Sequence, residues 1–168
     1  MDRYTEVLGA LSSAAVRYLV IGVGGVNYYT LEGHTLFNTE DRDLFLPPDP
    51  DNLLRCWQVC EAQGLDLTSR DEPLERPLDR WLAERVAEQR ATIRAAGPQD
   101  VRLDLTLTMS GFTFDEVWPR RRTFQSEGLP IEVAPLDAIV ESKRVAGRPK
   151  DLLFFVTHED LLRELLSD

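Results

Sequence analysis

Two short stretches decide the fold: Val20-Ile21-Gly22-Val23-Gly24-Gly25-Val26-Asn27 and Asp41-Arg42-Asp43-Leu44-Phe45-Leu46. The first predicts an apolar strand that runs into a glycine turn and a short helix, and the second predicts an apolar strand that carries two carboxylates. Successive side chains of a strand point to opposite faces, so Asp41 and Asp43 share one face, roughly 6–7 Å apart along the backbone. Carboxylates beside a glycine-rich helix N-terminus can hold a divalent metal and a phosphate together, which indicates phosphoryl or nucleotidyl transfer.

The composition predicts one globular domain that spans residues 1–168. The chain is long enough for a full hydrophobic core, and its hydrophobic share of 43% is ordinary for a globular protein. No apolar segment approaches the roughly 20 residues that cross a bilayer, so we expect no membrane partner. The first residues lack a basic region followed by an apolar one, which predicts a cytoplasmic protein without a secretion signal.

The net charge of −10 argues against a broad surface for duplex nucleic acid, because that affinity comes from neutralising phosphates. Arg120-Arg121-Arg122 is either a solvated charge cluster or a small local basic patch. Cys56 and Cys60 lie four residues apart without a zinc-binding pattern around them. They are interpreted as small buried hydrophobic residues, with a redox or metal role as the alternative.

The hydrophobic periodicity predicts a mixture of α-helices and β-strands built around one sheet. Strands are predicted over 18–22, 43–46, 91–96 and 101–108, followed by a hairpin around Glu127-Gly128 that joins Phe124 to 131–133. Helices are predicted over 4–15, 25–31, 51–63, 78–89, 113–118, 135–146 and 149–166, the last with a break near His158. The polar, proline-bearing segment 66–77 is predicted to be a loop.

The strand over 101–108 supplies a further acid. Its apolar residues alternate with polar ones, so Asp104 shares a face with Thr106 and Thr108. If this strand pairs with the Asp41/Asp43 strand, the three carboxylates form a cluster that repels itself unless cations bind within it. The alternative is a sheet face that is simply solvated, with Asp104 as an ordinary surface acid.

The glycines and one lysine leave alternatives open. The glycine stretch lacks both a dinucleotide fingerprint and a Walker lysine, so a tight turn that needs glycine for steric reasons explains it equally well. Lys143 continues the apolar stripe of the helix over 135–146. Its ammonium group either reaches the edge of the protein or points into a cleft, where an anionic ligand would favour the second arrangement.

The order Gly24-Gly25, Asp41-x-Asp43 and a later Asp104 resembles the polymerase-β-like nucleotidyltransferase superfamily. The segments Leu103-Asp104-Leu105-Thr106, Ser110-Gly111-Phe112-Thr113-Phe114-Asp115 and Pro135-Leu136-Asp137-Ala138-Ile139 look like small bacterial nucleotidyltransferase-like proteins. So does Ser142-Lys143-Arg144-Val145-Ala146-Gly147-Arg148-Pro149-Lys150-Asp151-Leu152. That group is related to minimal nucleotidyltransferases and to abortive-infection toxins, and the resemblance covers residues 18–162.

The resemblance implies a nucleotidyltransferase fold, which is an α+β fold with a mixed β-sheet flanked by helices. It also implies a metal-dependent transfer of a nucleoside monophosphate from a nucleoside triphosphate (NTP). The catalytic residues that it implies are Asp41, Asp43 and Asp104, which would bind Mg²⁺ or Mn²⁺, with Asp104 helping to deprotonate the acceptor hydroxyl. The nucleotide-binding residues that it implies are Gly24, Gly25, Lys143, Arg148 and Lys150. The acceptor is unidentified: a small molecule, a tRNA end or a protein.

The sequence departs from the family pattern at three places. Gly25 stands where a serine is common, Phe37-Asn38-Thr39 replaces an expected arginine, and Arg42 replaces an aliphatic residue. These departures leave open a catalytically weakened member that binds a nucleotide or a protein partner, such as an antitoxin in a toxin–antitoxin module. The acceptor would be selected by residues 65–89 and by the surroundings of His34, which is interpreted as a turn residue rather than a base.

Overall fold

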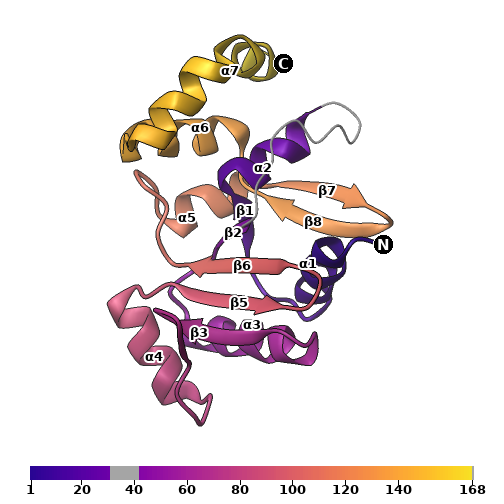
Figure 1. The fold of residues 1–168 in the computed structure, drawn as a ribbon, viewed down its shortest axis with the longest axis vertical. Coiled ribbons are helices and arrows are strands. Elements are labelled where there is room, and N and C mark those ends of the chain that lie inside the picture. The colour runs from indigo at the N-terminus through magenta and orange to yellow at the C-terminus, as the bar shows by residue number, and fades with distance from the viewer. Residues whose placement is uncertain (31–41, 168) are drawn as a thin grey trace.

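The computed structural model describes residues 1–30 and 42–167, and these residues form an α+β fold with one open, mixed sheet of eight strands. Figure 1 shows the strands running through the middle of the molecule. Their order across the sheet is β4 (Glu72–Pro73), β3 (Asp66–Ser69), β5 (Ile93–Gly97), β6 (Val101–Thr106), β2 (Arg42–Phe45), β1 (Leu19–Ile21), β8 (Leu129–Val133) and β7 (Arg122–Ser126).

Seven α-helices occur in the described residues. They are α1 (Arg3–Ser13), α2 (Gly22–Tyr29), α3 (Pro50–Ala62), α4 (Arg80–Gln89), α5 (Phe114–Val117), α6 (Leu136–Ala146) and α7 (Pro149–Ser167), with one 3₁₀ turn, η2 (Trp118–Arg120). Helices α6 and α7 lie at one end of the molecule, and α3 and α4 lie at the other (Figure 1). Within residues 1–30 and 42–167, none of the helices combines the length and apolar character needed to span a membrane.

The centre of the sheet fixes the relative positions of three strands. Strand β2 runs parallel to β6 on one side and antiparallel to β1 on the other. The register places Asp43 opposite Asp104 on β6 and opposite Ile21 on β1. Because β1 passes directly into α2, the N-terminus of that helix begins beside Asp43.

One face of the sheet is packed into the core. Val101, Leu103 and Leu105 of β6 are fully or almost fully buried, as are Leu11 of α1 and Trp57 of α3. The intervening residues of β6 are exposed or half-buried, which confirms the predicted alternation along this strand. Polar side chains that start from these positions therefore leave the sheet on the face away from that core.

Local capping explains several helix boundaries. The side chains of Asp2, Asp49 and Asp79 accept hydrogen bonds from backbone N–H groups in the first turns of α1, α3 and α4. Thr113 and Glu116 form a capping box at the start of α5. Each such bond satisfies a donor that the first turn of a helix leaves unpaired, so the sequence marks where these helices begin.

The end of the chain follows the predicted pattern. Helix α6 stops at Gly147, whose φ of +59° lies in the left-handed region that glycine adopts without strain. Pro149 is the first residue of α7, and His158 has non-helical backbone angles inside that helix, which confirms the predicted break.

Two predicted segments differ from the structure. Residues 66–77 are not a simple loop, because β3 and β4 form a hairpin in which β3 pairs with β5. Its turn places Arg70 and Asp71 at positive φ without glycine, which hides the usual sequence signal. Helix α2 begins at Gly22, three residues before its predicted start, since tertiary packing overrides the low helix propensity of glycine.

Candidate functional site

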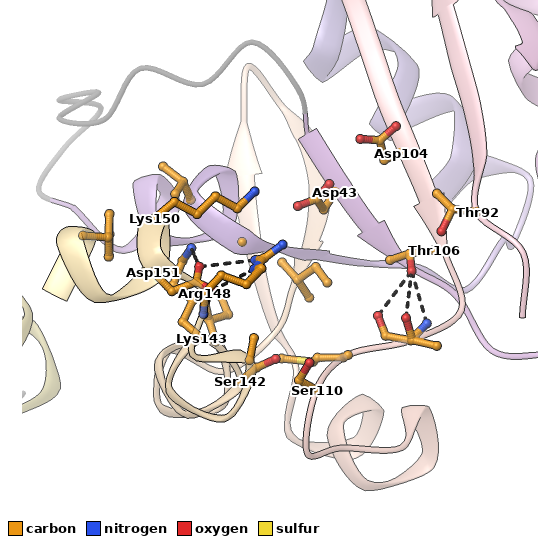
Figure 2. Close-up of a pocket in the computed structure, with 18 residues that line it drawn as sticks. Asp43, Thr92, Asp104, Thr106, Ser110, Ser142, Lys143, Arg148, Lys150 and Asp151 are labelled. Atoms are coloured by element: carbon orange, nitrogen blue, oxygen red, sulfur yellow. Dashed lines mark hydrogen bonds and ion pairs between the residues drawn. The ribbon is translucent and has the colours of Figure 1, made fainter. Parts of the chain in front are cut away.

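A cavity of about 900 Å³ opens beside the polar face of the sheet. Its lining comes from the end of β1, the start of α2, strands β2 and β6, the segment after β6, and helices α6 and α7. Figure 2 shows that the polar side chains gather in two groups. We call Asp43 and Asp104 the acidic wall, and Lys143, Arg148 and Lys150 the cationic wall.

The acidic wall is positioned by backbone pairing. Asp43 and Asp104 are direct partners on the parallel strands β2 and β6, so their side chains leave the same face of the sheet. Both line the cavity, as the sequence predicts for two members of an acid cluster. Asp104 therefore lies beside Asp43 rather than at an unrelated place on the surface.

Arg94 of β5 occupies the other side of Asp104. Its Nε donates to one carboxylate oxygen at 2.9 Å and its Nη2 donates to the other at 3.2 Å. Arg94 and Asp104 are also direct partners across β5 and β6. Sequence reasoning did not identify Arg94, although a basic residue on a strand next to an acidic one is the signal that would have pointed to it.

The cationic wall is built around a buried acid, Asp151. This side chain is 0% exposed and lies in the first turn of α7. Its Oδ2 accepts from Arg148 Nε at 2.7 Å and from the Arg148 backbone N–H at 3.2 Å, and its Oδ1 lies 3.4 Å from Lys143 Nζ. The structure thus brings the predicted nucleotide-binding residues Lys143 and Arg148 together through a residue that the sequence analysis did not single out.

The sequence feature that would have pointed to Asp151 is an acid in the third position of a helix. A carboxylate there accepts from the backbone N–H of the residue just before the helix, which is Arg148. Lys150 comes from the same first turn, and Figure 2 shows its amine extending towards Asp43. All three predicted cations therefore line one cavity with Asp43 and Asp104.

Burial and charge set the protonation of the cationic wall. Burial lowers the pKa of Lys143, while the carboxylate of Asp151 opposes that change. Burial alone would raise the pKa of Asp151, but the hydrogen bond from Arg148 and the charge of Lys143 outweigh it and lower the pKa. The hydrogen bond to Asp151 raises the pKa of Arg148, and the nearby charge of Asp43 raises it further. Asp151 is thus held as a carboxylate between two cations.

The glycine that borders the cavity is Gly22. Its φ is +68°, a backbone conformation that favours glycine, and a Cβ there would lie 3.0 Å from an Asp43 carboxylate oxygen. Gly24 and Gly25 are buried inside α2 instead. A Cβ on Gly25 would lie 2.8 Å from Ile139 Cδ1, so this glycine lets α2 pack closely on α6. Phosphate binding by Gly24 and Gly25 stays a prediction.

Arg42 lies on the side of β2 that faces away from the cavity. Its guanidinium carbon is 4.4 Å from the centre of the Tyr4 ring on α1. Its aliphatic stem lies 3.7 Å from where a Cβ on Gly24 would stand. The departure from an aliphatic residue at this position therefore serves packing between α1, α2 and β2, by an Arg–aromatic contact.

The donor set of the acidic wall fits a magnesium ion. Mg²⁺ prefers oxygen ligands and is commonly held by one or two carboxylates together with substrate phosphates and water. Asp43 and Asp104 supply two carboxylates on adjacent strands. Across residues 1–30 and 42–167, no three His, Cys, Asp or Glu side chains converge closely enough to hold a metal ion. Asp41 lies outside the described residues, so the three-acid cluster stays a prediction.

Neutral hydroxyl groups cover much of the rest of the cavity, and sequence reasoning missed most of them. They belong to Thr92, Thr106, Thr108, Ser110 and Ser142. Alternation along β6 predicts the face of Thr106 and Thr108, whereas Thr92, Ser110 and Ser142 come from separate segments that only the fold brings together. Thr106 Oγ1 accepts from the Thr108 backbone N–H at 3.2 Å, which orders this side of the cavity.

The arginine cluster and the two cysteines do not line the cavity. Arg120 forms an ion pair with Asp137 at 2.6 Å, and Arg121 forms one with Glu132 at 2.9 Å. The guanidinium carbon of Arg122 lies 5.0 Å from the centre of the Phe124 ring. All three arginines therefore contact neighbouring side chains of the protein. Cys56 and Cys60 are both buried, and the hydrogen bond between them, together with burial, raises the pKa of the Cys56 thiol. His34 and Phe37-Asn38-Thr39 lie outside the described residues.

The cavity combines an acidic wall suited to a divalent cation with a cationic wall suited to an anion. The first turn of α2 adds backbone N–H groups without a side-chain cap, at a helix end that attracts negative charge. An anionic ligand that carries its own divalent cation matches both walls at once. No protein-family model matches the sequence, and no curated protein matches it at a significant level.

Proposed function

We propose that this protein is a metal-dependent nucleotidyltransferase with the nucleotidyltransferase fold of the polymerase-β-like superfamily. One observation carries the proposal: Asp43 and Asp104 face Lys143, Arg148 and Lys150 across a single cavity. The order of these residues along the chain is the order that led to the resemblance. A triphosphate with a bound divalent cation is the ligand whose charges complement both walls.

In this proposal the cationic wall binds the phosphates of the NTP. Lys143 and Arg148 neutralise negative charge from the α6–α7 junction, and Lys150 reaches the same space from the first turn of α7. The N-terminus of α2 offers backbone N–H groups near Gly22, where phosphate groups bind readily. These contacts fix the triphosphate so that its α-phosphorus lies beside the acidic wall.

The acidic wall holds the reacting end of the substrates. Asp43 and Asp104 would hold Mg²⁺ or Mn²⁺, and Asp41 would join them as the resemblance implies. When bound, the ion supplies charge neutralisation and activates an oxygen nucleophile. The acceptor oxygen forms a bond to the α-phosphorus, the bond to the bridging oxygen breaks, and pyrophosphate leaves with that electron pair. Asp104 takes up the acceptor's proton.

Transfer from radiolabelled NTPs to candidate acceptors tests the proposal. We expect label to move from the α-phosphate of one NTP only when Mg²⁺ or Mn²⁺ is present. Asp43→Asn should reduce the rate by on the order of a hundredfold or more, because it removes a carboxylate charge that would hold the divalent cation beside the reacting phosphate. Asp160→Asn, an exposed acid of α7, is the matched control and should retain full activity. Full activity of Asp43→Asn would contradict the proposal.

The Arg94–Asp104 ion pair favours a second candidate function. A guanidinium group that holds both oxygens of Asp104 weakens the site as a metal centre. The protein would then be a non-catalytic relative that binds a nucleotide or a protein partner, such as an antitoxin in a toxin–antitoxin module. Nucleotide binding without any NTP turnover, over a range of acceptors and metals, would favour this candidate.

A further inference from the structure

Three charged side chains form a continuous row across the polar face of the sheet. Arg94 on β5 is the direct partner of Asp104 on β6, and Asp104 is the direct partner of Asp43 on β2. Neighbouring strands lie about 4.8 Å apart, so each side chain of the row reaches the next. Asp104 therefore stands between a guanidinium group on one side and a second carboxylate on the other.

The ion pair between Arg94 and Asp104 engages two guanidinium nitrogens and both carboxylate oxygens. The two hydrogen bonds, at 2.9 and 3.2 Å, engage both oxygens of the carboxylate in the bidentate geometry that arginine favours. A cation that bridges Asp43 and Asp104 would need the charge that this guanidinium already neutralises. Arg94 and a divalent cation are thus alternatives for the same carboxylate.

The Arg94 side chain has room to leave. It is 40% exposed, whereas Asp104 is 21% exposed. Partly exposed ion pairs contribute little net stability, because water replaces the lost contacts. The pair is therefore a contact that an incoming divalent cation can break, whereas the Asp151 carboxylate of the cationic wall is fully buried.

We propose that Arg94 is a positioning residue that competes with the divalent cation for Asp104, and so sets the affinity of the acidic wall for metal. The inference rests on the proposed function, since it assumes that the acidic wall is where metal binds. In the absence of metal, Arg94 neutralises the charge of Asp104 beside Asp43 and keeps the Asp104 carboxylate oriented. When metal binds, the guanidinium gives up its contact with Asp104.

A titration of the protein with Mn²⁺ tests this competition without any nucleotide, because electron paramagnetic resonance measures the ion that stays free in solution. Arg94→Gln removes the charge but keeps a side chain of similar length, and we expect about five- to tenfold tighter Mn²⁺ binding than in the wild type. Arg94→Lys keeps the charge but loses the bidentate contact, so its affinity should lie between the two. Arg94→Lys also serves if Arg94→Gln does not fold.

Two further variants separate competition from a general change in charge. Arg102→Gln removes the same charge from an exposed position on β6 and should change Mn²⁺ affinity much less than Arg94→Gln. In the background of Asp104→Asn, Arg94→Gln should lose its effect, because the contested carboxylate is gone. A gain in affinity from Arg94→Gln that persists in Asp104→Asn, or that Arg102→Gln equals, would overturn the inference.

The outcome is separable from that of the proposed function. Unchanged, weaker or undetectable Mn²⁺ binding by Arg94→Gln overturns the competition, even if the wild type transfers nucleotides. Tighter Mn²⁺ binding that depends on Asp104 supports the competition, even if no transfer is ever found.

Discussion

The two walls of the cavity are held in place by different kinds of interaction. On the acidic wall, backbone hydrogen bonds between β2 and β6 set the positions of Asp43 and Asp104. On the cationic wall, side-chain contacts with one buried carboxylate, Asp151, hold Lys143 and Arg148. The sheet would keep its carboxylates in register after a side-chain substitution, whereas the helix junction depends on a single residue.

The difference indicates how each wall should respond to mutation. Replacing an acid of the sheet removes a carboxylate but leaves the neighbouring strands paired. The proposed activity should therefore fall while the stability of the fold is kept. Replacing Asp151 leaves Lys143 with a buried charge and no compensating carboxylate, so function and stability should fall together.

The largest effect on stability is expected for Asp151→Asn. The substitution keeps the shape of the side chain but removes a fully buried charge that faces Arg148 and Lys143. Loss of one partner of a buried ion pair should lower the free energy of unfolding by about 2–4 kcal/mol. Urea unfolding measures the change, with Asp160→Asn of the same helix as the control. A stability equal to the wild type would show that Asp151 does not organise the junction.

Lys143→Met should separate binding from stability on the cationic wall. Loss of one charge-assisted contact to phosphate should weaken NTP binding by roughly ten- to a hundredfold. Stability should be kept or should rise, because burial disfavours the lysine charge, as its lowered pKa indicates. Isothermal titration calorimetry and urea unfolding measure the two effects. Unchanged affinity would contradict the proposed contact between Lys143 and phosphate.

The two glycines of α2 form a matched pair. A Cβ on Gly25 would meet Ile139 Cδ1 at 2.8 Å and the Val20 carbonyl oxygen at 3.0 Å, so Gly25→Ala should destabilise the fold by about 1–3 kcal/mol. Gly24→Ala brings a Cβ only to 3.7 Å from Arg42, an ordinary contact, and should be neutral or stabilising by up to about 1 kcal/mol. Thermal unfolding measures both.

The same pair tests the predicted role in phosphate binding. If Gly24→Ala weakens NTP binding while the fold stays intact, Gly24 is close to the phosphates as the resemblance implies. If neither variant changes NTP affinity once stability is accounted for, the predicted role of Gly24 and Gly25 in phosphate binding is wrong.

The sequence was informative where a regular pattern sets position. Alternation in β6 placed Asp104 on the face opposite to Leu103, and helical spacing singled out Lys143. The helices predicted over 135–146 and 149–166 match α6 and α7 to within one residue at each end. These features depend on short-range periodicity, which a single sequence contains.

The sequence was least informative where distant segments meet. Strand order decides that Arg94 lies beside Asp104, and no local pattern reports strand order. The roles of Gly24 and Gly25 depend on what packs against α2, which is Arg42 in one case and Ile139 in the other. The hairpin of β3 and β4 was missed because its turn lacks glycine and its pairing with β5 is a tertiary contact.

Acid titration should reveal the buried carboxylate of the helix junction, with the smallest effect of the series. The pKa of Asp151 in the folded protein lies below its ordinary value of 3.8, so its charge stabilises the fold above that pH. This stabilisation is lost as the pH falls below 3.8 through the pKa of the folded state. Asp151→Asn cannot titrate, so the stability difference between wild type and variant should narrow over this range.

Urea unfolding of both proteins, from pH 5 down to the lowest pH at which they stay folded, gives the difference in their free energies of unfolding. The contributions of the other acids are common to both proteins and cancel. Asp160→Asn, exposed on the same helix, should run parallel to the wild type over the whole range. A constant gap between wild type and Asp151→Asn would mean that the junction depends on the shape of the Asp151 side chain and not on its charge. The cationic wall would then be held by packing, as the core is. The two walls would differ only in which atoms position them, and not in whether a buried charge is needed.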